Sequence, residues 1–333
     1  MAKKLTRKTN VLKENVKLQK GFETFIKECE VKNLAEDTIK TYQRGWNFFL
    51  AFLSEKAEKE GVTIQYTSEM QREIPIEYIL YIRKKNPQIS DATVNNRLRS
   101  IRAVLYYFME NGYTEGFQIS QVKERLEEKE IYTEEEQIKL LKRPDTKADF
   151  TEYRNWVMLV HLFSTGNRTK TMREIKIKNV YLSRRVIFLE KTKNNDSYEI
   201  PISSSYFPIL KEYLDERLCQ GAQEDDYLFC NQFGSQFTAD GLRTSMYKYH
   251  KNRGVKKTSL HLIRHTFATT WIVSGGSPKK LQKALGQKSS VIVDKYVHMC
   301  ANDLIDDFEE FTPIGKIKDN LYSKTKLSRA RTR

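Results

Sequence analysis

Three polar residues on one predicted helix face have the types that phosphodiester chemistry needs. His261, Arg264 and His265 stand at positions i, i+3 and i+4 of a helix that Thr258 or Ser259 could cap, so their side chains share one side. A guanidinium can grip two phosphate oxygens, and an imidazole can move a proton near neutral pH. Taken alone, the triplet fits equally a surface polar cluster or a pair of metal ligands, and these alternatives stay open.

Further residues able to do chemistry lie on both sides of this helix. Upstream, Arg168 follows a Thr-Gly turn at the end of a predicted helix, and Lys191 and Lys193 lie in a predicted hairpin. Downstream, Tyr296 lies on a small predicted helix near the C-terminal end. Each has an ordinary explanation when taken singly, as a solvated charge or a packed aromatic ring. Their order and spacing together are more informative than any one of them.

Helices and one small sheet are predicted to position these residues. Thr133 and Glu136 form a capping box at the start of a helix that Pro144 ends, and another helix is predicted over 151–163. The hydrophobic period then changes to that of short strands. The predicted strands cover residues 179–182, 186–190 and 197–202. Everything after Ser203 is predicted to be helical again.

The first half of the chain is predicted to be almost wholly helical, with one helix over 38–53 and a long one after Ser90. The apolar stripe of the long helix is Val94, Leu98, Ile101, Leu105 and Phe108. Its opposite face carries Asn95, Asn96, Arg99 and Arg102. Arg and Asn can contact phosphates or base edges, so this face is a candidate DNA-binding surface. An ordinary solvated face is the alternative.

The composition favours a protein that binds a polyanion. A chain of 333 residues predicts two domains, and 39% hydrophobic residues exclude a wholly disordered or collagen-like chain. The 58 Lys and Arg against 43 Asp and Glu leave a formal charge of +15, which is typical of nucleic-acid binding and less often of membrane binding. No apolar stretch approaches the roughly 18 residues of a membrane span, and no signal peptide is recognised. Four widely separated cysteines predict a reducing, cytoplasmic location.

The order of these motifs resembles the tyrosine recombinase (phage integrase) family over nearly the whole chain. The family's Thr-Gly-x-Arg turn is matched by residues 165–168, and its His-x-x-Arg-His motif by residues 261–265. Its Leu-Gly-His motif is matched by residues 285–287, with the nucleophilic tyrosine nine residues later at Tyr296. Its catalytic lysine, eight residues before a proline, falls on Lys193. The helical first half is similar to the family's core-DNA-binding domain.

The chain departs from the family pattern at two positions. Gln287 stands where the family usually has His or Trp, and Thr171 stands where it usually has an acidic residue. An amide N–H of Gln287 can still donate to a phosphate oxygen. Thr171 cannot replace a carboxylate, so Glu174 is the nearest candidate to support Arg168. The nucleophile and both arginines are retained, which predicts an active enzyme.

The resemblance implies a role for each matched residue. Tyr296 would be the covalent nucleophile that forms a 3′-phosphotyrosine, and Arg168 and Arg264 would stabilise the charge of the transition state. His261 would accept the tyrosine proton and Lys193 would protonate the leaving 5′ oxygen. The supporting positions are His265, which would orient its neighbours, and Lys191, the alternative to Lys193. No metal and no other cofactor is required, because the arginines neutralise the phosphate charge.

The resulting fold class is mainly α with a small antiparallel sheet (α+β). The expected parts are a basic tail (1–17), a helical core-DNA-binding domain (18–115), a linker (116–130), a catalytic domain (131–312) and a basic tail (313–333). The expected partners are double-stranded DNA recombination sites and further copies of the chain in a homo-tetramer on paired sites, without a membrane. Accessory proteins are left open, as is the choice between integrase, transposase and resolvase. The alternatives are a type IB topoisomerase and a non-catalytic DNA-binding regulator derived from a recombinase.

Overall fold

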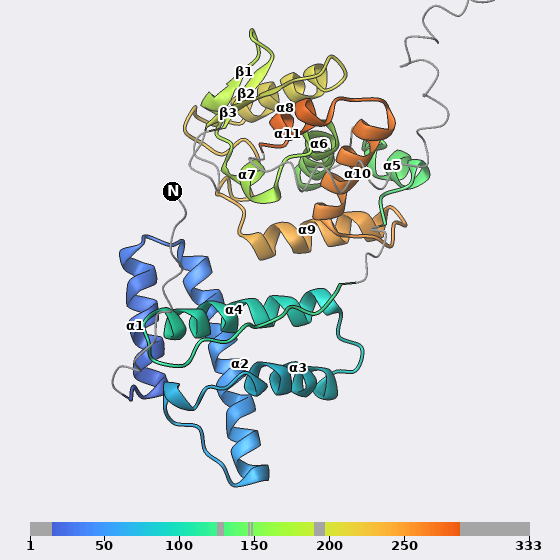
Figure 1. Ribbon diagram of the computed structural model, residues 1–333. Coiled ribbons are helices and arrows are strands. Elements are labelled where there is room, and N and C mark those ends of the chain that lie inside the picture. The colour runs from blue at the N-terminus through green and yellow to red at the C-terminus, as the bar shows by residue number, and fades with distance from the viewer. Residues whose placement is uncertain (1–14, 125–129, 146, 148, 190–196, 287–333) are drawn as a thin grey trace, which may run out of the picture. The chain divides into compact units, whose positions relative to one another are not determined.

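The protein consists of two compact, mainly helical units, residues 1–127 and 128–333 (Figure 1). The computed structural model describes residues 15–124, 130–145, 147, 149–189 and 197–286. The only sheet in these ranges has three antiparallel strands, so the predicted fold class is confirmed. The division between the units falls inside the predicted linker, and the exact domain bounds stay a prediction. No helix in the described ranges is long and apolar enough to cross a membrane.

The first unit is a helix bundle around a core rich in aromatic side chains. Its elements are α1 (Leu18–Val31), α2 (Glu36–Glu60), the 3₁₀ turn η1 (Thr67–Glu69), α3 (Glu73–Lys85) and α4 (Asp91–Glu110). Helix α4 packs against the other three α-helices. Trp46 of α2 stacks on Phe22 of α1 with ring centroids 4.9 Å apart, and both rings are buried. Burial of such large rings contributes strongly to the stability of a small bundle.

The long helix predicted after Ser90 is confirmed as α4. Ser90 is its N-cap and accepts a hydrogen bond from the backbone N–H of Thr93 at 3.3 Å. The predicted apolar stripe is fully buried. The helix predicted over 38–53 is also found, but it is longer and forms α2. The periodicity of the sequence is therefore a sound guide to the core of this unit.

The first part of the predicted linker is ordered against α4. Ile119 is buried, and the backbone N–H of Val122 donates to Asn95 Oδ1 at 2.9 Å. The Asn95 amide nitrogen in turn donates to the carbonyl of Val122 at 2.8 Å and to Glu124 Oε1 at 2.9 Å. Residues 116–124 thus pack as part of the first unit.

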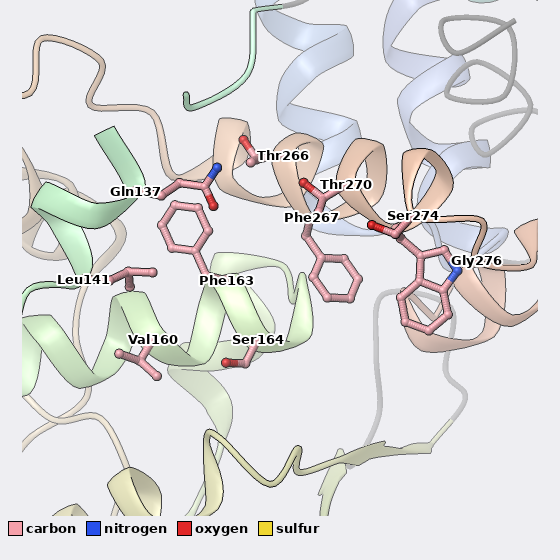
Figure 2. Close-up of a pocket in the computed structure, with 11 residues that line it drawn as sticks. Gln137, Leu141, Val160, Phe163, Ser164, Thr266, Phe267, Thr270, Ser274 and Gly276 are labelled. Carbon is pink, nitrogen blue, oxygen red and sulfur yellow. The ribbon is translucent and has the colours of Figure 1, made fainter. Parts of the chain in front are cut away.

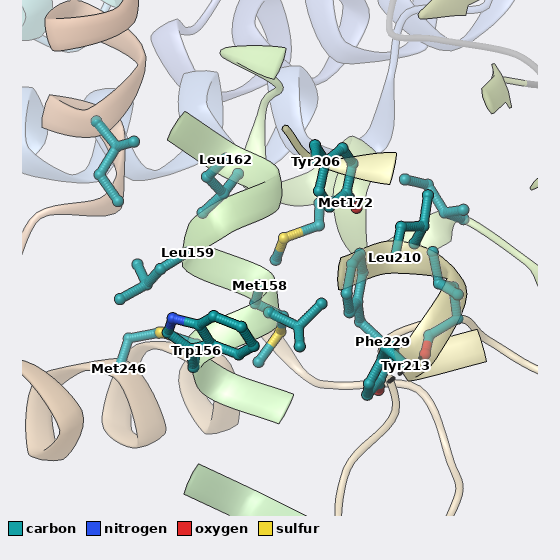
Figure 3. Packing of buried hydrophobic residues seen from close by; sticks show 14 of the residues in the cluster. Trp156, Met158, Leu159, Leu162, Met172, Tyr206, Leu210, Tyr213, Phe229 and Met246 are labelled. Carbon is teal, nitrogen blue, oxygen red and sulfur yellow. Dashed lines mark hydrogen bonds between the residues drawn. The ribbon is translucent and has the colours of Figure 1, made fainter. Parts of the chain in front are cut away.

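Helix α6 lies at the centre of the second unit (Figure 3). The helices of this unit are α5 (Glu134–Leu141), α6 (Phe150–Thr165), α7 (Thr169–Glu174), the 3₁₀ turn η2 (Ile177–Asn179), α8 (Phe207–Cys219), α9 (Ala239–Asn252), α10 (Leu260–Val273) and α11 (Pro278–Ala284). Helix α6 packs against α5, α8, α9 and α10. Val157, Met158 and Leu159 are all completely buried, as expected for a helix that is apolar on every side. The predicted capping box of Thr133 and Glu136 is present at the start of α5.

The small sheet of the second unit has the order β1-β2-β3. Its strands are β1 (Val180–Tyr181), β2 (Val186–Leu189) and β3 (Tyr198–Pro201). Ile187 pairs with Ile200, and both side chains point into the core, as alternation along a strand requires. The predicted hairpin is thereby confirmed, although the predicted Lys191 and Lys193 lie outside the described residues.

The prediction of continuous helices after Ser203 is wrong between α8 and α9. Residues 220–238 form an irregular segment instead, with Leu228 and Phe229 completely buried. The Asn231 side-chain oxygen accepts hydrogen bonds from the backbone N–H groups of Phe233 at 2.8 Å and Ser235 at 3.1 Å. Such local bonds from an Asn side chain stabilise a turn against a helix.

Candidate active site

Arg264 on α10 joins three segments that are far apart in the sequence. Its guanidinium is buried, with 4% of the residue exposed. One terminal nitrogen donates to the carbonyl of Gly166 at 2.8 Å, and the other donates to the carbonyl of Leu285 at 3.0 Å. These acceptors lie at the ends of α6 and α11. A single cation therefore fixes the relative positions of the two motifs that flank α10 in the sequence.

Arg168 is presented by a tight turn at the end of α6. Gly166 ends this helix in the left-handed conformation, with φ of 61°, and its N–H donates to the carbonyl of Leu162. Arg168 follows as the N-cap residue of α7 and is half-buried. Within the described residues its side chain makes no hydrogen bond or ion pair. A partly desolvated guanidinium in this position suits an anionic ligand such as a phosphate.

The two histidines of α10 contact each other edge to face. The rings of His261 and His265 have centroids 4.6 Å apart and planes at 85°. His261 is exposed and His265 is half-buried. One exposed and one packed imidazole, one helical turn apart, fit a proton acceptor and a neighbour that orients it. No group of three metal-binding side chains occurs in the part of the chain that the structure describes, so the metal-pair interpretation gains no third ligand there.

Tyr198 is a site residue that sequence reasoning missed. It lies on β3, and burial raises the pKa of its hydroxyl, while the positive charges of Arg264 and Arg168 act in the opposite direction. Its hydroxyl donates to Asn167 Oδ1 at 3.2 Å, directly beside Arg168. A Cβ atom on Gly286 would lie 2.6 Å from the Tyr198 ring, so the ring packs tightly against that glycine. No motif marks Tyr198, because its place in the site arises only from folding.

The remaining predicted catalytic residues lie outside the described residues. These residues are Lys191, Lys193, Gln287 and Tyr296. The structure does describe the two residues that precede Gln287. Gly286 has a left-handed φ of 58°, and the carbonyl of Leu285 accepts a hydrogen bond from Arg264. The backbone that leads to Gln287 is therefore anchored to the buried arginine.

The predicted support of Arg168 by Glu174 is not observed. Glu174 is exposed at the end of α7, and it forms no ion pair or hydrogen bond with Arg168. Thr171, at the position where the family usually has an acidic residue, is half-buried on the same helix. Directly before Arg168 in the sequence, the buried amide of Asn167 is hydrogen-bonded on both sides, to His161 and to Tyr198.

A pocket of about 580 Å³ lies beside α10, and Arg264 is not among the residues that line it (Figure 2). It is bounded by α5, α6 and α10. Its lining residues are Gln137, Leu141, Val160, Phe163, Ser164, Thr266, Phe267, Thr270, Trp271, Ser274 and Gly276. The lining is mainly apolar and carries no charged side chain. This pocket is therefore unsuited to hold a phosphate group and suits an apolar segment.

The candidate DNA-binding face on α4 is only partly exposed. Asn96 and Arg99 are exposed, one turn apart. Arg102 is half-buried, with its guanidinium over the ring of Tyr106 at 5.5 Å. Asn95 is 3% exposed, and its amide is used to hold residues 122–124. Asn95 therefore has a structural role here and leaves the predicted DNA-binding face.

Known proteins share both the sequence pattern and this architecture. Residues 130–302 match the Phage integrase family. The tyrosine recombinase XerD of Listeria innocua is 24% identical over 290 residues, which cover 85% of this chain and 94% of that protein.

Two solved structures share the fold. The XerH site-specific recombinase bound to a palindromic difH substrate in a post-cleavage complex has a TM-score of 0.62 at 21% identity, covering 86% of this chain and 84% of that one. The Tn1549 transposon integrase in complex with a circular intermediate DNA has a TM-score of 0.63 at 20% identity, covering 83% and 94%. With more than half of the chain matched and the arginine motifs joined in one site, the protein belongs to the phage integrase family of tyrosine recombinases, enzymes that cleave and rejoin DNA.

Proposed function

We propose that this protein recombines specific DNA sites through a 3′-phosphotyrosine intermediate. The Tyr296 oxygen attacks the scissile phosphorus, a tyrosine–phosphate bond forms, and the bond to the 5′ oxygen breaks. The tyrosine proton passes to His261, and Lys193 gives a proton to the leaving 5′ oxygen. Attack by the 5′ hydroxyl of a second strand reverses these steps, so the ester conserves the bond energy and no ATP is needed.

The position of Arg264 is the observation that carries this proposal. Negative charge increases on the non-bridging phosphate oxygens as the tyrosine attacks. A guanidinium that is buried and fixed by two backbone carbonyls is already in place to stabilise this charge, because it needs no reorganisation during the reaction. Arg168 projects from the turn that Arg264 holds, and Gln287 follows the Leu285–Gly286 segment that Arg264 also holds.

Binding to double-stranded DNA would involve the first unit as well. Asn96 and Arg99 are exposed on α4, and Arg102 lies on the same predicted face. Arg can bind phosphates or guanine edges, and Asn can bind adenine edges. The formal charge of +15 on the whole chain adds a non-specific attraction that salt weakens.

Strand exchange would take place in a homo-tetramer on two paired sites. Leu304, Ile305, Phe308 and Phe311 recur at helix-like spacing beyond Tyr296, outside the described residues. The uncharged pocket between α5, α6 and α10 is an apolar receptor of suitable chemistry for this segment from a neighbouring copy (Figure 2). Deleting residues from Ala301 onward is then expected to preserve binding to a single site and to abolish exchange between two sites. Full recombination by the truncated protein would contradict this assembly.

A nicked suicide substrate tests the proposed chemistry. Cleavage beside the nick releases a short fragment that carries the free 5′ hydroxyl. This fragment diffuses away and cannot reseal the strand, so an active enzyme accumulates a covalent protein–DNA adduct that is visible in a denaturing gel. The Tyr296→Phe variant is expected to bind the same DNA and to form no adduct. DNA binding without an adduct by the unaltered protein would favour the regulator alternative, and an adduct in the Phe variant would refute Tyr296 as the nucleophile.

A further inference from the structure

A chain of four hydrogen-bonded side chains runs through the core of the second unit to the two arginines. It starts at Tyr206, next to α8, whose hydroxyl lies 3.0 Å from Nδ1 of His161 on α6. Nε2 of His161 lies 3.2 Å from the amide nitrogen of Asn167, and Asn167 Oδ1 accepts from the Tyr198 hydroxyl at 3.2 Å. Three elements and the Gly166–Arg168 turn thus share one buried network.

The protonation state of His161 gives the network a defined direction. His161 is completely buried, and burial lowers its pKa to about 3, so the imidazole is neutral at physiological pH. With the Asn167 amide nitrogen donating to Nε2, the ring proton is on Nδ1 and is donated to the Tyr206 oxygen. The side-chain oxygen of Asn167 is then left to accept from Tyr198. Both ring nitrogens of His161 and both polar atoms of the Asn167 amide thus have a partner, and the amide is held in one orientation.

Tyr198 forms the end of this network at the point where the catalytic segments meet. Asn167, which it binds, lies between Gly166 and Arg168 in the sequence. The carbonyl of Gly166 accepts from Arg264, and the Tyr198 ring packs on Gly286, just before Gln287. A shift of the Tyr198 side chain would therefore move the turn that carries Arg168 and the carbonyl that holds Arg264.

We propose that Tyr198 and Asn167 are positioning residues, whose mutual hydrogen bond holds Arg168 and Arg264 in the geometry that receives the scissile phosphate. This inference rests on the proposed function, since it assigns the arginines to the phosphate. Tyr198 acts through its neighbours and need not touch DNA. Losing its hydroxyl should therefore reduce the stabilisation of the transition state more than it reduces the affinity for DNA. The reason is that a small misplacement of a charge-stabilising group mainly affects the reaction step.

The Tyr198→Phe variant tests this role with Tyr213→Phe as a matched control. Tyr213 lies in the same unit, and its buried hydroxyl donates to the carbonyl of Leu228 at 3.1 Å, so its removal also deletes one internal hydrogen bond. The measurements are the dissociation constant for the DNA site and the single-turnover rate of adduct formation on the suicide substrate at saturating protein. Tyr198→Phe is expected to slow adduct formation about tenfold, equal to about 1.4 kcal/mol in the barrier, with the dissociation constant unchanged. Tyr213→Phe is expected to leave the rate of adduct formation unchanged. Because each variant loses one internal hydrogen bond, the two variants are expected to lower the temperature midpoint of unfolding to a similar extent.

A double-mutant cycle separates positioning from a general structural effect. If Tyr198 acts through Arg168, the loss from Tyr198→Phe should shrink in an Arg168→Lys background, whereas a loss through general destabilisation should be additive. Equal rates in the Tyr198→Phe and Tyr213→Phe variants, or full additivity in the cycle, would overturn the inference. A rise in the dissociation constant with an unchanged saturated rate would overturn it as well. If the unaltered protein formed no adduct at all, the proposed function would fail, and this inference would fail with it.

Discussion

Replacing Gly166 by alanine should disturb both the stability of the second unit and its reaction. Gly166 has a φ of 61°, a conformation that costs an L-residue about 1–2 kcal/mol. The added Cβ would also overlap the ring of Phe267 and lie 2.8 Å from Cδ2 of Leu285. Overpacking of this kind costs about 1–3 kcal/mol. The Gly166→Ala variant is therefore expected to lose about 2–5 kcal/mol of the free energy of unfolding.

Gly221→Ala is the matched control for this substitution. Gly221 follows α8 with a φ of 86°, and no atom lies within 4 Å of its added Cβ. This control carries the conformational cost without the overlap, so the difference between the two variants measures the overlap alone. In calorimetric unfolding, the midpoint temperature of the Gly166→Ala variant should lie below that of Gly221→Ala by roughly 2–4 °C for each kcal/mol of this difference.

Cleavage of the suicide substrate adds the functional readout. The Gly166 carbonyl is an acceptor for Arg264, so Gly166→Ala is expected to slow adduct formation even below the unfolding transition, while Gly221→Ala is not. Equal destabilisation of the two variants would refute the overlap. Normal cleavage by a destabilised Gly166→Ala protein would refute the link between this turn and the arginines.

Three other predictions concern the general acid, the unusual glutamine and the buried histidine. Lys193→Ala should slow cleavage of normal DNA and be rescued by a substrate with sulfur in place of the leaving 5′ oxygen, since sulfur needs no general acid; lack of rescue would move the role to Lys191. Gln287→His should leave adduct formation within a few fold or increase it if Gln287 only donates a hydrogen bond, and a collapse of the rate would show a pocket built around an amide. His161 has its pKa lowered to about 3, so below about pH 6.5 the unfolded chain binds a proton that the folded one does not, and stability should fall as the pH falls, by up to about 1.4 kcal/mol per pH unit. Chemical unfolding measured between pH 7 and 4 gives the free energy of unfolding at each pH. This free energy should fall less steeply with falling pH in a His161→Gln variant, and an unchanged pH dependence would contradict the prediction.

The parts of the fold that could be predicted are those that local rules determine. The apolar stripe of α4, the Ser90 cap and the capping box of α5 depend on residues within one or two turns of each other. The hairpin of β2 and β3 follows from alternation between two turn sequences. The irregular segment around Asn231 was missed, because a side chain bonded to its own backbone competes with a helix without changing the hydrophobic pattern.

The candidate site was predictable only where a motif names its residue. The resemblance to the family predicts that Arg168 and Arg264 act together. In the structure Arg264 donates to the carbonyl of Gly166, two residues before Arg168, and the joint action of the two arginines stays a prediction. Asn95 was placed on the DNA-binding face because helical periodicity identifies a face and not what covers it. In the structure residues 122–124 cover that position. The role of Tyr198 could not be predicted, because its partner Asn167 is 31 residues away in the sequence.

The buried network itself indicates a functional constraint on the second unit. His161 interrupts an otherwise apolar part of α6, and an apolar residue there would need no hydrogen-bond partners. A buried polar group without a partner costs about 1–3 kcal/mol, so a network of this kind is stable only when every member is satisfied. Apolar replacements of similar shape are often as stable as a satisfied polar group. Stability alone therefore gives little reason for His161 and Asn167. Their directional bonds do what apolar packing cannot: they fix the orientation of the amide beside Arg168, and with it the turn whose carbonyl holds Arg264.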